Sequence, residues 1–290
     1  MIRVDPITGA VLGIIHTEPK DITSIACDPT NGHLYLACAA DNNVVAINSS
    51  GGVLWTASYG TRVRCVAVTN SGYVYAVGSG GTVKKYDAAS GAAITSGWPY
   101  THGAGLTGVC VDQSGNVYVC GSTNVGLKNC VALTNGGSVR WSVRIPDTPG
   151  FQTCNGLAID AAGAGIALAK DGNSPTAQTA FSVDAATGGF VGAIHGQQMG
   201  CAACGYVMGY QLVGGVANAG GYRVRKDLLV HYKGVFTISS LAVGPDNREF
   251  AAQGSSGVWS ITDGWSITGA FGTTFQNVET SAGRVGAFGL

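Results

Sequence analysis

Short apolar stretches separated by turn-forming pairs follow one another along the chain, and residues 63–98 show the pattern most clearly. This segment reads VRCVAVTNSGYVYAVGSGGTVKKYDAASGAAITSGW. Short alternating or continuous apolar runs are typical of β-strands with one or both faces buried, and pairs such as Ser-Gly and Asn-Gly turn the chain between antiparallel strands. The pattern predicts a four-stranded antiparallel sheet.

The same unit recurs along the sequence. Residues 23–55 and 107–141 align with residues 63–98, and the three units end at Trp55, Trp98 and Trp141, two intervals of 43 residues. Weaker copies begin at residues 154, 205, 239 and 277, and an apolar position in the first strand of each copy recurs about every 42 residues. A four-stranded unit of this length is typical of the blade of a β-propeller.

The last copy contains only two strands, and the N-terminal residues provide the missing two. Residues 1–9 align with the third and fourth strands of the second copy and place Asp5 on Asp87. Pairing the first strand with the last removes free sheet edges. We therefore predict an all-β fold in a single domain, residues 1–290. It is a seven-bladed β-propeller of four-stranded antiparallel blades, closed by a composite blade of residues 1–14 and 275–290.

Two sets of aspartates occupy repeated positions. Asp5, Asp87 and Asp184 each begin a D-x-x-[ST]-G segment, in which the carboxylate can accept turn amides and the glycine can adopt positive φ. We predict that these three residues form turns. A second set follows the first strand of three copies and is predicted to form Asx-turns, with a cation or polar ligand at the channel rim as the alternative: Asp28, Asp112 and Asp160.

Composition narrows the possible partners. The chain is 46% hydrophobic and 11% charged, and sixteen basic residues balance sixteen acidic ones to a net charge of +0. Binding to nucleic acid through a general electrostatic field is therefore not expected. No apolar run approaches the ~18 residues of a membrane span. Met1 leads into a strand-like segment without the regions of a signal peptide, so we expect synthesis in the cytoplasm.

The candidate chemistry is sparse. Nine cysteines do not indicate a disulfide framework in a chain of this length, and most lie in apolar strand patterns as small buried residues. Cys201 and Cys204, with His195 upstream, lie in a segment expected to join the fourth and fifth copies, where zinc and a disulfide are the alternatives to packing. The sequence lacks a local metal-ligand or nucleophile motif. We predict no catalytic residue, metal site or cofactor, and hence no enzyme.

The segment VYAVGSGGTVKKYDAASGAAITSGW resembles the repeat of pyrroloquinoline-quinone-type propellers, and VCVDQSGNVYVCGSTN resembles an NHL repeat. The resemblance is clear over residues 1–143. It implies the propeller fold, and it implies that Trp55, Trp98 and Trp141 pack between neighbouring blades. Quinoprotein dehydrogenases of the first family carry two adjacent cysteines over the cofactor. Since no two cysteines are adjacent here, a quinone cofactor is not expected.

One segment differs from the repeat and suggests a contact surface. The fifth copy concentrates basic and aromatic residues, which are favoured at interfaces, although a solvated strand face is the alternative: Tyr222, Arg223, Arg225, Lys226 and Tyr232. A charge-poor surface is expected where neighbouring subunits cover it. We therefore expect a non-catalytic structural scaffold that binds other protein subunits in a virus particle, such as a bacteriophage tail, neck or fibre component. The alternatives are a carbohydrate-binding adhesion module with a glycan ligand and a propeller enzyme that acts on glycans at the channel mouth.

Overall fold

The computed structural model describes the chain except residues 6, 9, 18–20, 123–127, 145–153, 160–164, 171–177, 197–198, 205–209, 216–221, 226–228, 232–239, 244–248, 254–256, 261–265, 268–274, 282–283 and 290. Within the described residues every helix or strand assigned is a β-strand. No described segment forms an apolar helix long enough to cross a membrane.

The described strands pair into seven antiparallel sheets, six of which are formed by consecutive strands. The first three sheets are β3 (Ile22–Cys27), β4 (Leu34–Cys38), β5 (Asn43–Ile47) and β6 (Val53–Ser58); β7 (Val63–Val68), β8 (Tyr73–Gly78), β9 (Thr82–Asp87), β10 (Ala93–Ile94) and β11 (Tyr100–Thr101); and β12 (Leu106–Val111), β13 (Val117–Gly121), β14 (Cys130–Leu133) and β15 (Val139–Val143).

The next three sheets follow the same order. They are β16 (Cys154–Ile159), β17 (Gly165–Lys170), β18 (Gln178–Asp184) and β19 (Phe190–Gly196); β20 (Met199–Cys204), β21 (Tyr210–Gly215), β22 (Tyr222–Arg225) and β23 (Leu229–His231); and β24 (Ser240–Val243), β25 (Glu249–Gln253), β26 (Gly257–Ser260) and β27 (Ser266–Ile267).

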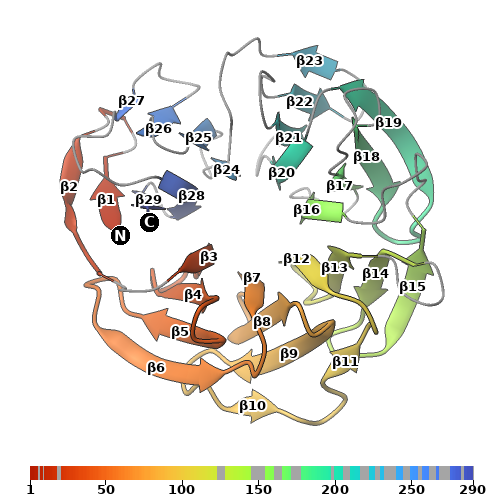
Figure 1. Ribbon diagram of the computed structural model, residues 1–290, viewed down its shortest axis with the longest axis horizontal. Coiled ribbons are helices and arrows are strands. Elements are labelled where there is room, and N and C mark those ends of the chain that lie inside the picture. The colour runs from red at the N-terminus through yellow and green to blue at the C-terminus, as the bar shows by residue number, and fades with distance from the viewer. Residues whose placement is uncertain are drawn as a thin grey trace.

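The remaining sheet combines the two ends of the chain. Its order is β2 (Val11–Ile14), β1 (Ile2–Val4), β29 (Arg284–Gly289) and β28 (Phe275–Ser281). β1 runs antiparallel to β29, with Ile2 opposite Ala287 and Val4 opposite Val285. Both chain termini therefore lie at the same sheet (Figure 1).

The sheets lie around a common centre, with β3, β7, β12, β16, β20, β24 and β28 innermost (Figure 1). Each innermost strand contacts the innermost strand of the next sheet, and β28 contacts β3. The predicted all-β class and the four-stranded antiparallel unit are confirmed.

Neighbouring sheets bury their faces against one another. One buried cluster joins Tyr35 and Trp55 of the first sheet to Val74 and Tyr86 of the next. Because the middle strands are covered on both faces, they read as continuous apolar runs, and every residue of β4 and β13 is buried.

The second sheet departs from the predicted single fourth strand. Two short strands, β10 and β11, both pair with β9. The interruption contains Gly97, at a φ of 72°, and Pro99. Proline cannot donate a ladder hydrogen bond, so an outer strand is broken at such a segment.

The fifth sheet also begins earlier than predicted. Its innermost strand is β20, which contains Cys201 and Cys204, whereas the sequence pattern placed the start of this copy at residue 205 and the cysteines in a connecting segment. Both cysteines therefore lie within a strand and not in a connection. Six cysteines of the described residues are reduced thiols outside any disulfide: Cys27, Cys38, Cys65, Cys110, Cys120 and Cys130.

Candidate functional site

The repeated aspartates act within their own turns. Asp87 Oδ1 accepts hydrogen bonds from the backbone N–H groups of Ala89 (3.1 Å) and Ser90 (2.8 Å) and from the Ser90 hydroxyl (2.7 Å). These bonds, above all that from the Ser90 hydroxyl, lower the pKa of Asp87 below its ordinary value. Asp5 accepts the equivalent bonds from Ile7 and Thr8, and Asp184 accepts them from Ala186 and Thr187.

The aspartates after the innermost strands are also engaged locally. Asp28 is 4% exposed, and its Oδ1 accepts hydrogen bonds from the backbone N–H (2.8 Å) and hydroxyl (2.6 Å) of Thr30. Asp112 accepts hydrogen bonds from the backbone and side-chain amides of Asn116, both at 2.8 Å. Asp160 lies outside the described residues. Within the described residues no group of three or more His, Cys, Asp and Glu side chains is arranged to hold a metal ion.

The three tryptophans that end the repeats lie at the junctions between sheets, and each is at most 9% exposed. Each indole N–H donates to a backbone carbonyl in the turn between the third and fourth strands of the next sheet. The pairs are Trp55 with Ala88 at 2.9 Å, Trp98 with Asn135 at 3.1 Å and Trp141 with Ala185 at 2.9 Å. The tryptophans therefore join adjacent sheets and do not offer an exposed aromatic platform.

A buried lysine strengthens one of these junctions. Lys85 on β9 is 6% exposed, and its Nζ donates to the side-chain oxygen (2.6 Å) and carbonyl oxygen (3.1 Å) of Asn135. The same Nζ lies 3.9 Å from the centroid of the Tyr73 ring and 5.9 Å from that of Trp98. Burial lowers the pKa of Lys85. Amide oxygens and aromatic rings thus hold this cation between two sheets.

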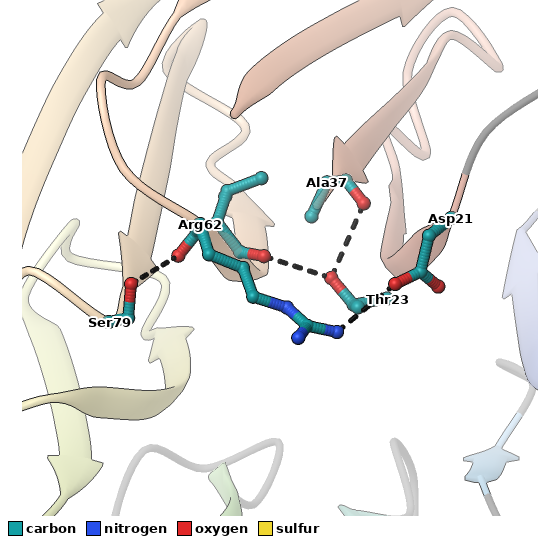
Figure 2. Close-up of polar contacts among 6 residues, drawn as sticks. Asp21, Thr23, Ala37, Arg62 and Ser79 are labelled. Carbon is teal, nitrogen blue, oxygen red and sulfur yellow. Dashed lines mark hydrogen bonds and ion pairs between the residues drawn. The ribbon is translucent and has the colours of Figure 1, made fainter. Parts of the chain in front are cut away.

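An exposed polar cluster lies where β3 and β7 begin. We call Asp21, Thr23, Arg62 and Ser79 the β3–β7 cluster, because an ion pair and hydrogen bonds link them to Arg62 and to the Val63 carbonyl. Arg62 Nη2 lies 3.1 Å from Asp21 Oδ2, and the two side chains are 58% and 32% exposed. Figure 2 shows the Arg62 side chain extending toward Asp21 across the junction of the two sheets. An exposed pair of this kind contributes about 0–1 kcal/mol to stability.

Beside the ion pair, backbone carbonyls and hydroxyls link the two sheets. The Thr23 hydroxyl, which carries one proton, lies 3.3 Å from the carbonyl oxygen of Ala37 and 3.2 Å from that of Val63 (Figure 2). The Ser79 hydroxyl donates to the carbonyl oxygen of Arg62 at 3.4 Å. These contacts fix the backbone that carries the two arginines.

A β-bulge recurs at the second residue of six innermost strands. In each case the strand register shifts by one residue against the next strand of the sheet, which leaves one residue outside the pairing. The bulged residues are Thr23, Arg64, Thr107, Asn155, Gly200 and Gln276. Bulges are frequent beside functional sites because they redirect side chains.

Arg64 differs from the threonines at the equivalent positions. The hydroxyls of Thr23 and Thr107 lie 3.3 and 3.2 Å from the carbonyl oxygens of Ala37 and Cys120, which stand next to the bulge on the partner strand. Arg64 is exposed, and its guanidinium makes no hydrogen bond or ion pair with any residue that the structure describes. The bulge in β7 therefore presents an unpaired cation two residues after Arg62.

Exposed apolar side chains gather at the outer strands. In the described part of the chain, all exposed large hydrophobic residues lie on an outermost strand or in the turn before β2. They are Ile7, Val11, Leu12, Ile14, Val53, Leu54, Val139 and Phe190. The strands that carry these apolar residues, β2, β6, β15 and β19, lie at the outside, whereas β3 and β7, which begin beside the β3–β7 cluster, are innermost (Figure 1).

The structure describes only some residues of the predicted basic and aromatic surface. β22 contains Tyr222, Arg223 and Arg225, and Arg225 lies opposite Tyr210 of β21. Lys226 and Tyr232 lie outside the described residues.

Comparison with known proteins supports the repeat but not a specific activity. A family model described as a beta-propeller repeat (SBBP) matches residues 106–128, which include β12 and β13. This segment is similar to a β-propeller repeat. The match supports a propeller-like family in general and does not single out the pyrroloquinoline-quinone or NHL repeats. No curated protein matches the chain.

The sequence interpretation missed the β3–β7 cluster, Arg64, Lys85 and Asn135. The alignment of the repeat copies contained one usable signal, since it places Arg64 where neighbouring copies have Thr23 and Thr107. Asp21 and Arg62 carry no such signal, because each lies in a connection that varies between copies.

Proposed function

We propose that the chain is a closed seven-bladed β-propeller that serves as a non-catalytic scaffold for other protein subunits. The pairing of β1 with β29 and the contact of β28 with β3 support closure. The repeated tryptophan contacts between sheets support rigidity. A rigid ring held together in this way can present fixed surfaces to neighbours.

Closure can be tested with the chain ends. Deletion of residues 1–14 removes β1 and β2 and uncovers the edge of β29, so we expect the cooperative calorimetric transition to weaken strongly or disappear. A circular permutant that joins the old ends through a short linker and opens the chain at the exposed turn residues 113 and 114 should keep a single transition. An unchanged transition after the deletion would contradict closure.

The observation that carries the scaffold proposal is the set of exposed apolar residues on the outer strands. Leu12 is 58% exposed, Ile14 67% and Val53 57%, in a chain with only 11% charged residues. A partner docked on the outer strands would cover several such side chains at once, which would remove their apolar surface from water. The outer strands are bulged at Leu12 and Leu54, which disfavours edge-to-edge strand pairing, so we expect contact through side chains. A virus particle, such as a bacteriophage tail, neck or fibre, is the assembly we propose.

A photoreactive amino acid can test this surface. Placed at Leu12 or Leu54, it should crosslink to other subunits in particles purified from the producing cells, and mass spectrometry would identify the crosslinked chains. The same group at Ser114, which is exposed in a polar turn, is the control and should give fewer crosslinks. Equal yields at the three positions would contradict a docking role for the outer strands.

The two alternative functions require different features. An adhesion module that stacks sugars on aromatic rings needs exposed aromatics, and in the described residues the only strongly exposed large aromatic is Phe190. An enzyme that acts on glycans needs a pair of carboxylates at suitable spacing, whereas the described Asp28 and Asp112 are bound within their own turns. The scaffold is therefore the function we favour.

A further inference from the structure

We propose that Cys120 and Cys130 form a redox-sensitive pair, which closes to a disulfide between β13 and β14 in an oxidising medium. This inference goes beyond the scaffold role and depends only on the sheet of β12 to β15. Its test can therefore fail while the scaffold proposal stands.

The two cysteines lie opposite each other on neighbouring antiparallel strands. The register pairs Cys120 of β13 with Cys130 of β14. Residues directly opposite in such a pair extend from the same face of the sheet, and both cysteines belong to the same buried cluster. Both are reduced thiols. The two sulfur atoms therefore stand on the same side of adjacent strands.

The position of the pair in the ladder suits a disulfide. At the next pair along, the Gly121 N–H donates to the Asn129 carbonyl oxygen at 3.1 Å, so Gly121 and Asn129 form a hydrogen-bonded pair. Hydrogen-bonded and non-hydrogen-bonded pairs alternate in an antiparallel ladder, and Cys120 and Cys130 thus form a non-hydrogen-bonded pair. The Cα atoms of such a pair are about 4.5 Å apart, within the range of about 4.4–6.8 Å that a disulfide spans.

Packing alone does not require sulfur at this position. Cys120 and Cys130 occupy the first pair after the bulge of their sheet, and the two preceding sheets have aliphatic residues there, Ala37 with Val44 and Val77 with Val83. A single buried cysteine acts as a small apolar residue, but two in register can also join covalently.

The register singles out this pair. Each of the other four cysteines that the structure describes as reduced lies opposite residues of other types on the neighbouring strands. The pairs are Cys27 with Leu34, Cys38 with Ile22 and with Asn43, Cys65 with Val77, and Cys110 with Tyr118.

A small disulfide such as oxidised glutathione supplies the oxidant. The thiolate of one cysteine attacks a glutathione sulfur, so that a mixed disulfide forms and one glutathione thiolate leaves. The second cysteine thiolate attacks the protein sulfur of the mixed disulfide, which forms the bond between Cys120 and Cys130 and releases the second glutathione. The two cysteines are oxidised, oxidised glutathione is reduced to two glutathione molecules, and the two thiol protons end on these molecules.

Burial makes the pair slow to react. Both side chains are 0% exposed, so the attack requires local opening of the sheet. Cys120 is the second-last residue of β13 and Cys130 the first of β14, and strands open more readily at their ends than at their centres. Once formed, the disulfide restricts the unfolded chain and stabilises the sheet. The chain is therefore more stable in an oxidising medium than in a reducing one.

The test incubates the reduced full chain with oxidised glutathione, with and without urea at half the concentration of the unfolding midpoint. This urea promotes local opening while the protein stays folded. Remaining thiols are then blocked with iodoacetamide, and mass spectrometry of the non-reduced digest identifies linked peptides. We expect a link between Cys120 and Cys130 as the main product of these two residues, within single chains, and faster formation in urea. The Tm should rise by about 4–8 °C and return to its original value on reduction.

Two variants make the test specific. Cys130→Val is expected to fold, because Val44 and Val83 stand at the equivalent position, and it should show no rise in Tm with oxidised glutathione. Cys110→Ala is the matched control: it removes a thiol of the same sheet that lies opposite Tyr118, and it should leave the yield of the link and the rise in Tm unchanged.

Three results would overturn the proposal. The first is recovery of Cys120 and Cys130 as blocked thiols or glutathione adducts from both samples, with and without urea. The second is a link that joins Cys120 mainly to another cysteine. The third is an equal rise in Tm in Cys130→Val, which would assign the stabilisation to other cysteines. A Cys120–Cys130 link in either sample, together with loss of the Tm rise in Cys130→Val, would support the pair.

Discussion

The indole N–H of Trp55 donates a 2.9 Å hydrogen bond to the carbonyl oxygen of Ala88, and this bond crosses from one sheet to the next. The Trp55 ring also packs 5.8 Å from the Tyr35 ring of its own sheet and 6.5 Å from the Tyr86 ring of the neighbouring sheet, centroid to centroid. The residue therefore joins apolar packing on both sides with one directed bond. Trp141 repeats the arrangement with Ala185 two sheets further along.

Trp55→Phe should destabilise the protein because it removes the bond and leaves the Ala88 carbonyl with one partner fewer in a buried junction. We expect a loss of about 1–3 kcal/mol in the free energy of unfolding, measured by urea denaturation. Val53→Ala, at a side chain 57% exposed two residues away, is the control and should change stability by less than about 0.5 kcal/mol. Equal stability of Trp55→Phe and the unmodified chain would rule out the junction role.

Substitutions at two glycines can distinguish the cost of backbone strain from the cost of close packing. Gly91 has a φ of 73°, and a Cβ atom there would lie 2.7 Å from the Trp55 ring. Gly72 has a similar φ of 80° and has nothing within 4 Å of that position. Gly72→Ala should therefore cost only the strain of positive φ, about 1 kcal/mol.

Gly91→Ala should lower the free energy of unfolding by about 1–3 kcal/mol more than Gly72→Ala does, because the Trp55 ring must also move. Thermal or urea unfolding of the two variants gives the comparison directly. If the two substitutions cost the same, the Trp55 ring does not pack tightly on this turn.

The repeat pattern in the first half of the chain could predict the sheets because buried strands such as LYLAC and VYVCG are recognisable from apolarity alone. β20 could not be placed in the same way. Its sequence MGCAAC contains no β-branched or aromatic residue, so its strand preference is weak, and only contact with neighbouring strands makes it the innermost strand of its sheet.

The candidate site was harder to predict than the fold. A bulge shifts the apolar alternation by one residue and therefore looks like an ordinary irregularity in one copy. Only the pairing shows that Arg64 and Thr23 hold the same bulged position. The partners of the tryptophans were also hidden, since Ala88 and Ala185 accept through backbone carbonyls and their side chains carry no signal.

Asp87 should make stability depend on pH in the acid range. Its pKa is lowered in the folded protein by hydrogen bonds, chiefly from the Ser90 hydroxyl, so its contribution is present above the ordinary pKa of about 4 and is lost as pH falls through the lower folded pKa. Asp87→Asn keeps an acceptor oxygen for the turn and removes only the charge, so it should lower the free energy of unfolding by no more than about 1 kcal/mol at pH 7.

Urea unfolding at a series of pH values gives the free energy of unfolding of Asp87→Asn and of the unmodified chain. The difference between the two free energies should shrink as the pH falls from about 5 to about 2. Ser90→Ala removes the 2.7 Å bond from the hydroxyl and should show a shallower dependence than the unmodified chain. A pH-independent difference would mean that Asp87 stabilises the turn without its charge.

Buried tyrosines should weaken the fold in the alkaline range. Burial is the main cause that raises the pKa values of Tyr35, Tyr86 and Tyr118 to about 12. In the unfolded chain these groups ionise near pH 10, so their neutral forms stabilise the fold below that pH, and the contribution is lost as the pH rises toward 12. Each such tyrosine should lower the free energy of unfolding by about 1.4 kcal/mol per pH unit across this range.

Tyrosinate absorbance and circular dichroism, followed together, can test this expectation. The last tyrosines should ionise together with loss of the β signal, and not before it. Tyr35→Phe removes one of the buried phenols, whose hydroxyl donates to the Ala88 carbonyl at 3.3 Å, and should make the decline in stability above pH 10 shallower by one proton. Val53→Ala should leave the slope unchanged, because it alters no titratable group. Ionisation of all tyrosines near pH 10 in the folded protein would contradict the burial of these rings at the sheet junctions.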